Sequence, residues 1–170
     1  VLEDFERGNA LKAWDLDVGA KVEEGQALLH FTRVSRWHPW RDPWPSLRLL
    51  YGEGLFASGN WDDYDWLEFV VENRSALAAL LKLRVDDADG TRATRLFTLP
   101  AGRRQICRVD LGLLRQEIDL DRVVLIDLYM SQPARSYTLA LDDIRLIADQ
   151  VNPAAAELFS DPLGGGAVRV

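Results

Sequence analysis

The chain has 170 residues, enough for one domain with a substantial apolar core. Its 27 acidic and 20 basic residues give a formal net charge of −7, which argues against nucleic acid or an anionic membrane as the main partner. No stretch approaches the roughly 18 consecutive apolar residues of a membrane span. The single cysteine, Cys107, excludes an intrachain disulfide and a cysteine-based zinc site. Because the chain starts Val1-Leu2-Glu3, with neither an initiator Met nor a signal peptide, we expect a domain of a longer protein.

Short β-type segments separated by turn residues recur along the chain, a pattern typical of an all-β sandwich or barrel of about ten strands. The strands predicted in this way are residues 2–6, 14–18, 26–33, 47–51, 67–73, 78–86, 94–99, 104–111, 122–130 and 137–147. Segment 67–73 alternates apolar with mostly polar residues, so we expect one face in the core and the other mostly in water. Segment 122–130 is apolar on both faces, which predicts a central strand with Asp127 as an unusual buried acid.

The connections between these strands contain three further signals. Residues 87–90, Asp-Ala-Asp-Gly, predict a hairpin turn; the alternative, a fragment of a calcium loop, lacks the downstream Glu of an EF-hand. Residues 110–117 predict a short helical turn, and Asn152-Pro153 predicts the start of a helix near the C-terminus. We therefore divide the chain into a β-sandwich, residues 1–148, and a short helix with a flexible linker or tail, residues 149–170.

Templates for catalysis are not found. The sequence has no His-Glu-x-x-His, Gly-x-Ser-x-Gly or phosphate-binding glycine loop, and its two histidines are too few for a histidine-rich metal centre. His30 lies in a predicted strand and is interpreted as a packed or surface residue, and Cys107 as a small core residue. A pair of glycosidase carboxylates is neither excluded nor indicated, because no pair stands apart from the other acids. We expect a protein that is not an enzyme.

The unusual segment is residues 36–46, RWHPWRDPWPS, which holds three of the six tryptophans. Prolines keep this loop out of a sheet, and indoles offer flat apolar surfaces of the kind that stack on a sugar ring. Polar neighbours can orient the sugar through its hydroxyls. The candidate ligand-binding residues are Trp37, Trp40, Trp44, Arg36, His38, Arg41 and Asp42. The alternative is that these tryptophans fold inward and cap the core, which we expect for at least one of them.

Residues 60–66, NWDDYDW, hold two more tryptophans just before a predicted strand. A mixed aromatic and acidic site built from Trp61, Asp62, Tyr64 and Asp65 is one interpretation. Aromatic residues that lead into a strand more often plug the core, and we favour that role.

Several patches, taken in order, resemble a known family. They are LEDFE at 2–6, QAL at 26–28, WDDYDWLEFVVEN at 61–73, LRVDD at 83–87 and LDDIRL at 141–146. This series is similar to the galactose-binding-like jelly rolls of carbohydrate-binding modules attached to bacterial agarases, β-galactosidases and related polysaccharide-degrading enzymes. The resemblance spans roughly residues 2–148 and implies a two-sheet antiparallel jelly-roll β-sandwich.

The resemblance also implies a structural calcium ion, held between the first and last strands by Glu6, Asp4, Asp142 and Asp143. Carboxylates are suitable calcium ligands, and the alternative is a set of solvated acids at a strand bulge. It further implies binding of a polysaccharide or oligosaccharide, through the loops or a sheet face, by a non-catalytic module of a secreted, extracellular or periplasmic enzyme. Arginines beside the tryptophan loop would favour acidic or sulfated glycans. The alternative function is a structural or protein-interaction domain that braces a neighbouring catalytic domain, with its tryptophans buried against that domain.

Overall fold

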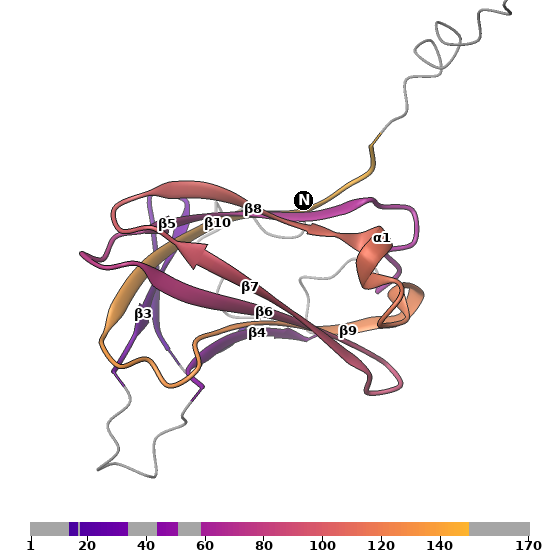
Figure 1. The fold of residues 1–170 in the computed structure, drawn as a ribbon, viewed down its shortest axis with the longest axis horizontal. Helices are drawn as coiled ribbons and strands as arrows, with labels where there is room; N and C mark the ends of the chain where they lie inside the picture. The colour runs from indigo at the N-terminus through magenta and orange to yellow at the C-terminus, as the bar shows by residue number, and fades with distance from the viewer. Residues whose placement is uncertain (1–13, 17, 34–43, 51–58, 150–170) are drawn as a thin grey trace, which may run out of the picture.

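Two antiparallel sheets face each other in the computed structural model, which describes residues 14–16, 18–33, 44–50 and 59–149 (Figure 1). The first sheet has the order β1 (Trp14–Leu16), β4 (Ser46–Leu50), β9 (Val123–Tyr129), β6 (Ala79–Asp87) and β7 (Arg92–Leu99). The second has the order β2 (Gly19–Glu23), β3 (Gln26–Phe31), β10 (Tyr137–Ile147), β5 (Trp66–Asn73) and β8 (Arg104–Asp110). Neighbouring strands are mostly distant in sequence, as in a jelly roll, and the predicted fold class is confirmed.

Each predicted strand that falls on the described residues is confirmed within two residues at each end. Segment 14–18 corresponds to β1, and a further strand, β2, follows it. We did not predict β2 because its sequence, GAKVE, has little apolar content, and its burial alternates only between exposed and intermediate. The predicted strand at 2–6 and the predicted helix after Asn152 lie outside the described residues.

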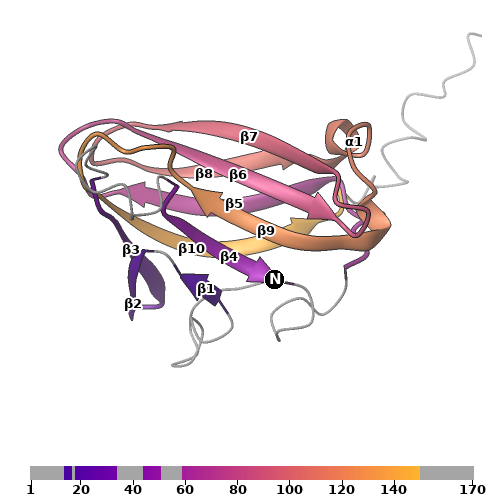
Figure 2. The same cartoon turned by 90° about the horizontal axis from the view of Figure 1, so that it is seen from below.

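The core lies between the two sheets. Side chains from both inner faces are almost fully buried, among them Phe31, Leu47, Phe69, Leu83, Ile126, Leu128 and Leu139. Strand β9 is the middle strand of its sheet, as its two apolar faces predicted. Figure 2 shows the same layers from below, with the short helix α1 (Leu111–Leu114) at one end. Asp110 caps α1 by accepting a hydrogen bond from the Leu113 backbone N–H at 3.0 Å, as expected for the helical turn at 110–117.

Trp61 plugs the core, whereas Trp66 does not. The Trp61 side chain is fully buried, and its backbone N–H donates to the carbonyl of Leu120, in the 3-10 helix η2 (Leu120–Arg122), at 2.7 Å. Trp66 is only half-buried, and its Nε1 donates to a carboxylate oxygen of Asp149 at 3.0 Å. The interpretation of segment 60–66 as a plug is therefore correct for its first tryptophan only.

The Asp87 carboxylate organises the turn between β6 and β7. One oxygen accepts hydrogen bonds from the backbone N–H groups of Asp89, at 3.0 Å, and Thr91, at 2.9 Å. The other oxygen accepts from the N–H of Asp119 at 3.0 Å, which ties the turn to η2. The bond from Asp119, with those from Thr91 and Asp89, lowers the pKa of Asp87 despite its burial. Gly90 has a φ of 82°, as the predicted turn requires. The interpretation as a turn is confirmed.

The outward face of β5 is not mostly in water, contrary to the prediction. Glu68 is fully buried and Val70 is only 8% exposed. Arg108 of β8 and Arg145 of β10 lie directly opposite Glu68 in the sheet register, one on each side. Their long side chains cover this carboxylate and donate hydrogen bonds to it. Alternation within one strand did not reveal this cover, because it comes from neighbouring strands.

Candidate functional site

Of the seven predicted ligand-binding residues, only Trp44 can be placed. Trp37, Trp40, Arg36, His38, Arg41 and Asp42 lie outside the described residues, and no role for them is tested. Trp44 directly precedes β4, and its side chain is 50% exposed. The residue after Trp44, Pro45, is anchored to the sheet, because its carbonyl accepts a hydrogen bond from the backbone N–H of Met130 at 3.2 Å. Trp44 therefore does not cap the core, and half of its side chain is open to solvent just before β4 begins.

The outer surface of strands β4, β9, β6 and β7, which we call the β9 face, has a row of charged residues at its centre. Arg48 of β4 pairs in register with Asp127 of β9, and Asp127 pairs in turn with Arg84 of β6. In the next row, Tyr129 lies between Ser46 and Lys82. Side chains directly opposite each other in an antiparallel sheet are about 5 Å apart at Cβ, so these groups form one continuous surface.

Asp127 is the buried member of this row, as the sequence predicted. It is 5% exposed, and its Oδ2 lies 3.7 Å from Nε of Arg48. Its other oxygen, Oδ1, is buried and has no hydrogen-bond partner within the described part of the chain. Burial raises the pKa of Asp127 to about 6, although the charges of Arg48 and Arg84 act in the opposite direction. The two arginines therefore offset only part of the free-energy cost of burying the ionised carboxylate.

The other charged groups of the β9 face are held in defined positions. Nε of Arg84 donates to Oδ1 of Asp86 at 2.6 Å, and its Nη2 donates to Oδ2 of the same carboxylate. Nζ of Lys82 lies 5.7 Å from the centroid of the Tyr129 ring, within the range of a cation–π interaction. The face thus presents guanidinium, ammonium and aromatic groups side by side, on a rigid sheet.

The outer surface of β10, β5 and β8, with Arg74, is called the β5 face, and its charges are arranged differently. Glu68 binds Arg108 and Arg145, and these bonds lower its pKa although desolvation acts to raise it. Asp142 accepts from Arg104 at 3.2 Å and from Gln26 at 3.4 Å. Each carboxylate of this network binds an arginine, which indicates a structural role.

The predicted calcium ligands do not converge in the part of the chain that the structure describes. Asp142 binds Arg104, and Asp143 binds Arg145 at 3.1 Å. No cluster of three or more potential ligands occurs among the described residues. Two carboxylates that are each engaged by an arginine are not a calcium donor set on their own. Asp4 and Glu6 lie outside the described residues, so calcium stays a prediction that depends on them.

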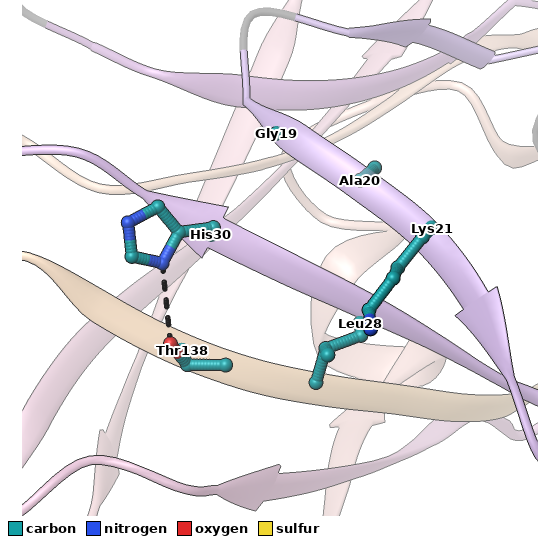
Figure 3. Close-up of a pocket in the computed structure, with 6 residues that line it drawn as sticks. All are labelled: Gly19, Ala20, Lys21, Leu28, His30 and Thr138. Atoms are coloured by element: carbon teal, nitrogen blue, oxygen red, sulfur yellow. Dashed lines mark hydrogen bonds between the residues drawn. The ribbon is translucent and has the colours of Figure 1, made fainter.

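An open hollow of about 390 Å³ lies on the outer side of β2, β3 and β10. Figure 3 shows its lining residues: Gly19, Ala20, Lys21, Leu28, His30 and Thr138. The imidazole Nδ1 of His30 lies 3.2 Å from the hydroxyl of Thr138, so His30 is a surface residue, as interpreted from the sequence. The hollow has no Trp, Tyr or Phe in its described lining and offers a poorer stacking surface than the β9 face.

Cys107 is a buried core residue, as predicted. It is 2% exposed, and burial raises the pKa of its thiol, which keeps it protonated and unreactive. No helix within the described residues is long and apolar enough to cross a bilayer.

Comparison with known proteins gives structural matches. No protein-family model matches the sequence, and no curated protein matches it. Among solved structures, the chain is similar to an agarase, AgWH50C, with a TM-score of 0.71, 14% identity and 85% of this chain covered. It is also similar to a family 11 carbohydrate-binding module from Clostridium thermocellum in complex with a β-1,3-1,4-mixed-linked tetrasaccharide, with a TM-score of 0.65, 14% identity and 86% covered. A family 29 module matches with a TM-score of 0.53 and 11% identity over 84% of this chain.

The chain has the fold of a jelly-roll carbohydrate-binding module. It spans 93% of the family 11 module and 85% of the family 29 module, but only 25% of the agarase. The fold implied by the resemblance of the sequence patches is therefore confirmed.

Sequence reasoning did not single out Arg48, Arg84 and Tyr129, which the strand pairing places on one face with Asp127. A signal was present for the two arginines, since each interrupts an apolar strand at an outward position. Their common position became visible only through the pairing of β4, β9 and β6.

Proposed function

We propose that this chain is a non-catalytic carbohydrate-binding module that binds a polysaccharide along the β9 face, beside Trp44. One observation carries the proposal. The half-exposed Trp44 stands two residues before Ser46, the first residue of β4, and on the outer face of that sheet Tyr129 and the row of Arg48, Asp127 and Arg84 lie together. A protein surface that recognises a sugar chain combines aromatic side chains, which stack on the sugar rings, with fixed hydrogen-bond donors for the hydroxyls.

The chemistry of the face suits a glycan. The ring of Trp44 stacks on the apolar side of a sugar ring, and guanidinium N–H groups donate to its hydroxyls. Tyr129, whose ring centroid lies 5.7 Å from Nζ of Lys82, adds its hydroxyl and apolar surface. Asp127 is a positioning residue for Arg48, whose Nε lies 3.7 Å from its carboxylate, whereas Arg84 is held by Asp86. The groups spread over several strands, which favours an extended sugar chain over a single sugar.

Structural similarity supports the same proposal. The modules matched over nearly their whole length are described as carbohydrate-binding, and one was solved with an oligosaccharide. The similarity to a quarter of an agarase supports a further step, in which the module brings an attached, secreted polysaccharide-degrading enzyme to its substrate. In that arrangement the chain acts outside the cytoplasm and needs no catalytic residues of its own.

The test is isothermal titration calorimetry of the 170-residue chain against agar oligosaccharides, mixed-linkage β-glucan, mannan, xylan, galactan and pectin. We expect saturable binding to one glycan class, with no release of reducing sugar. The absence of binding across the panel would contradict the proposal and favour the alternative, a domain that braces a neighbouring one. Release of reducing sugar would show that the chain is an enzyme.

A further inference from the structure

We infer that the β9 face selects glycans that carry carboxylate or sulfate groups over neutral glycans with the same backbone. This inference rests on the proposed function and names the class of ligand for that site.

Positive charge is concentrated on the β9 face of an acidic protein. On β4, β9, β6 and β7 the charged residues of this face are four cations, Arg48, Lys82, Arg84 and Arg92, and two carboxylates, Asp86 and Asp127; on the edge strand β1, Asp15 pairs in register with Arg48. The β5 face differs, since its four arginines, Arg74, Arg104, Arg108 and Arg145, pair with Glu68, Glu72, Asp142 and Asp143. The formal charge of the whole chain is −7. The β9 face therefore carries more cations than carboxylates, although the whole molecule is acidic. Tyr129 lies on the same face.

The geometry of the arginines fits an oxyanion. A guanidinium presents its donors in a planar fork that matches carboxylate and sulfate oxygens. Asp86 engages the Nε and Nη2 edge of Arg84, and the Nη1 group lies on the other side of that guanidinium. Arg92 of β7 lies in register with Asp86, so its exposed side chain extends the line of cations toward the edge of the sheet.

Asp127 makes this charge excess depend on pH. The charged and titratable groups that face it are Arg48 from β4, Arg84 and Asp86 from β6, and Tyr129 from its own strand. Burial raises the pKa of Asp127 to about 6, so the carboxyl is neutral below that pH and negative above it. The face is therefore more positive at low pH, and an anionic glycan is held more tightly there.

The experiment compares two matched pairs of ligands: homogalacturonan oligosaccharides with their methyl esters, and a sulfated galactan with its desulfated form. We expect the charged member to bind roughly tenfold more tightly at about 0.05 M salt, and this advantage to shrink at about 0.5 M salt, since exposed charge pairs are screened. Between about pH 7.5 and about pH 5, affinity for the charged member should rise several-fold, because Asp127 takes up a proton.

Three variants locate the effect. Arg92→Gln should lower the preference for the charged ligand, whereas Arg104→Gln, which removes the same charge from the β5 face, should leave it unchanged. Asp127→Asn should remove the pH dependence of binding. If this variant does not fold, the pH dependence measured on the wild-type chain still tests the inference.

Equal affinity for both members of each pair, without salt dependence, would overturn this inference and leave the proposed function standing. Failure of every ligand, including the glycan panel above, would instead overturn the proposed function itself.

Discussion

Arg48 and Asp127 face each other across the paired strands β4 and β9, with Nε of the arginine 3.7 Å from Oδ2 of the acid. Arg84 occupies the equivalent position on the other side, in β6. The pKa of Asp127 is nevertheless raised by burial, so two neighbouring arginines do not offset the loss of water around this carboxylate. A buried acid of this kind contributes to the placement of its neighbours more than to stability.

We predict that Trp44→Ala weakens glycan binding roughly tenfold, which corresponds to about 1.4 kcal/mol, the upper part of the range for a stacked aromatic contact. The melting temperature should change by only a few degrees, because half of this side chain is already in water. Calorimetric titration and thermal unfolding measure the two effects.

The matched control is Trp61→Ala. Its fully buried indole should cost about 3–5 kcal/mol of unfolding free energy when removed. A similar loss of stability in both variants would show that Trp44 is a core residue and not a binding surface.

Asp127→Asn should stabilise the protein above pH 6. The folded-state pKa of about 6 exceeds the ordinary 3.8, so the unfolded chain releases its proton first as the pH rises. The contribution of Asp127 to stability therefore falls between pH 3.8 and pH 6 and is constant above that range. We expect the variant to gain on the order of 2–3 kcal/mol relative to the wild type across this window. Urea unfolding at several pH values measures this difference, and a constant difference would show that the pKa is not raised.

Glu68→Gln should destabilise the protein at neutral pH, in contrast to Asp127→Asn. The pKa of Glu68 is lowered below 4.5, so its contribution to stability is present above that pH and is lost as the pH falls through the lowered value. At neutral pH we expect a loss of about 1–2 kcal/mol, because Arg108 and Arg145 remain partly exposed to water.

Glu117→Gln is the control for this variant, because it breaks an exposed ion pair with Arg95 and should leave the melting temperature unchanged within error. If the two variants behaved alike in thermal unfolding, burial of Glu68 would have no energetic consequence.

Calcium should raise the melting temperature, and EDTA should lower it, if Asp4 and Glu6 complete a site with Asp142 and Asp143. The matched variants are Glu6→Gln, which should abolish the response, and Glu117→Gln, which should retain it. An unchanged melting temperature with calcium and with EDTA would show that Asp142 and Asp143 serve only their arginine partners.

Local sequence patterns were sufficient for most of the strands. Strand β9 was predicted as central from its two apolar faces, and the turn at Asp87 from its Asp and Gly residues. These features depend on short-range rules, namely side-chain alternation and the conformational preference of glycine. Strand β2 was missed because it lies at the edge of its sheet, where burial is incomplete and alternation is weak.

The candidate site was only partly predictable. Trp44 and Asp127 each stand out in the sequence, one as an indole among prolines and the other as a lone acid in an apolar strand. The burial of Glu68 under Arg108 and Arg145 was not predictable. These arginines belong to the two strands that flank β5 in the sheet, but they are 40 and 77 residues away from Glu68 in the sequence.

By itself, the sequence determined a β-sandwich with a strong apolar core, no recognisable catalytic motif and a cluster of tryptophans before β4. Only the tertiary structure decided that Arg48, Arg84 and Asp127 share one face, since their strands are far apart in the chain. The physical reason is that alternation sets the face of each residue within its own strand, whereas the choice of neighbouring strand depends on the packing of the whole sandwich.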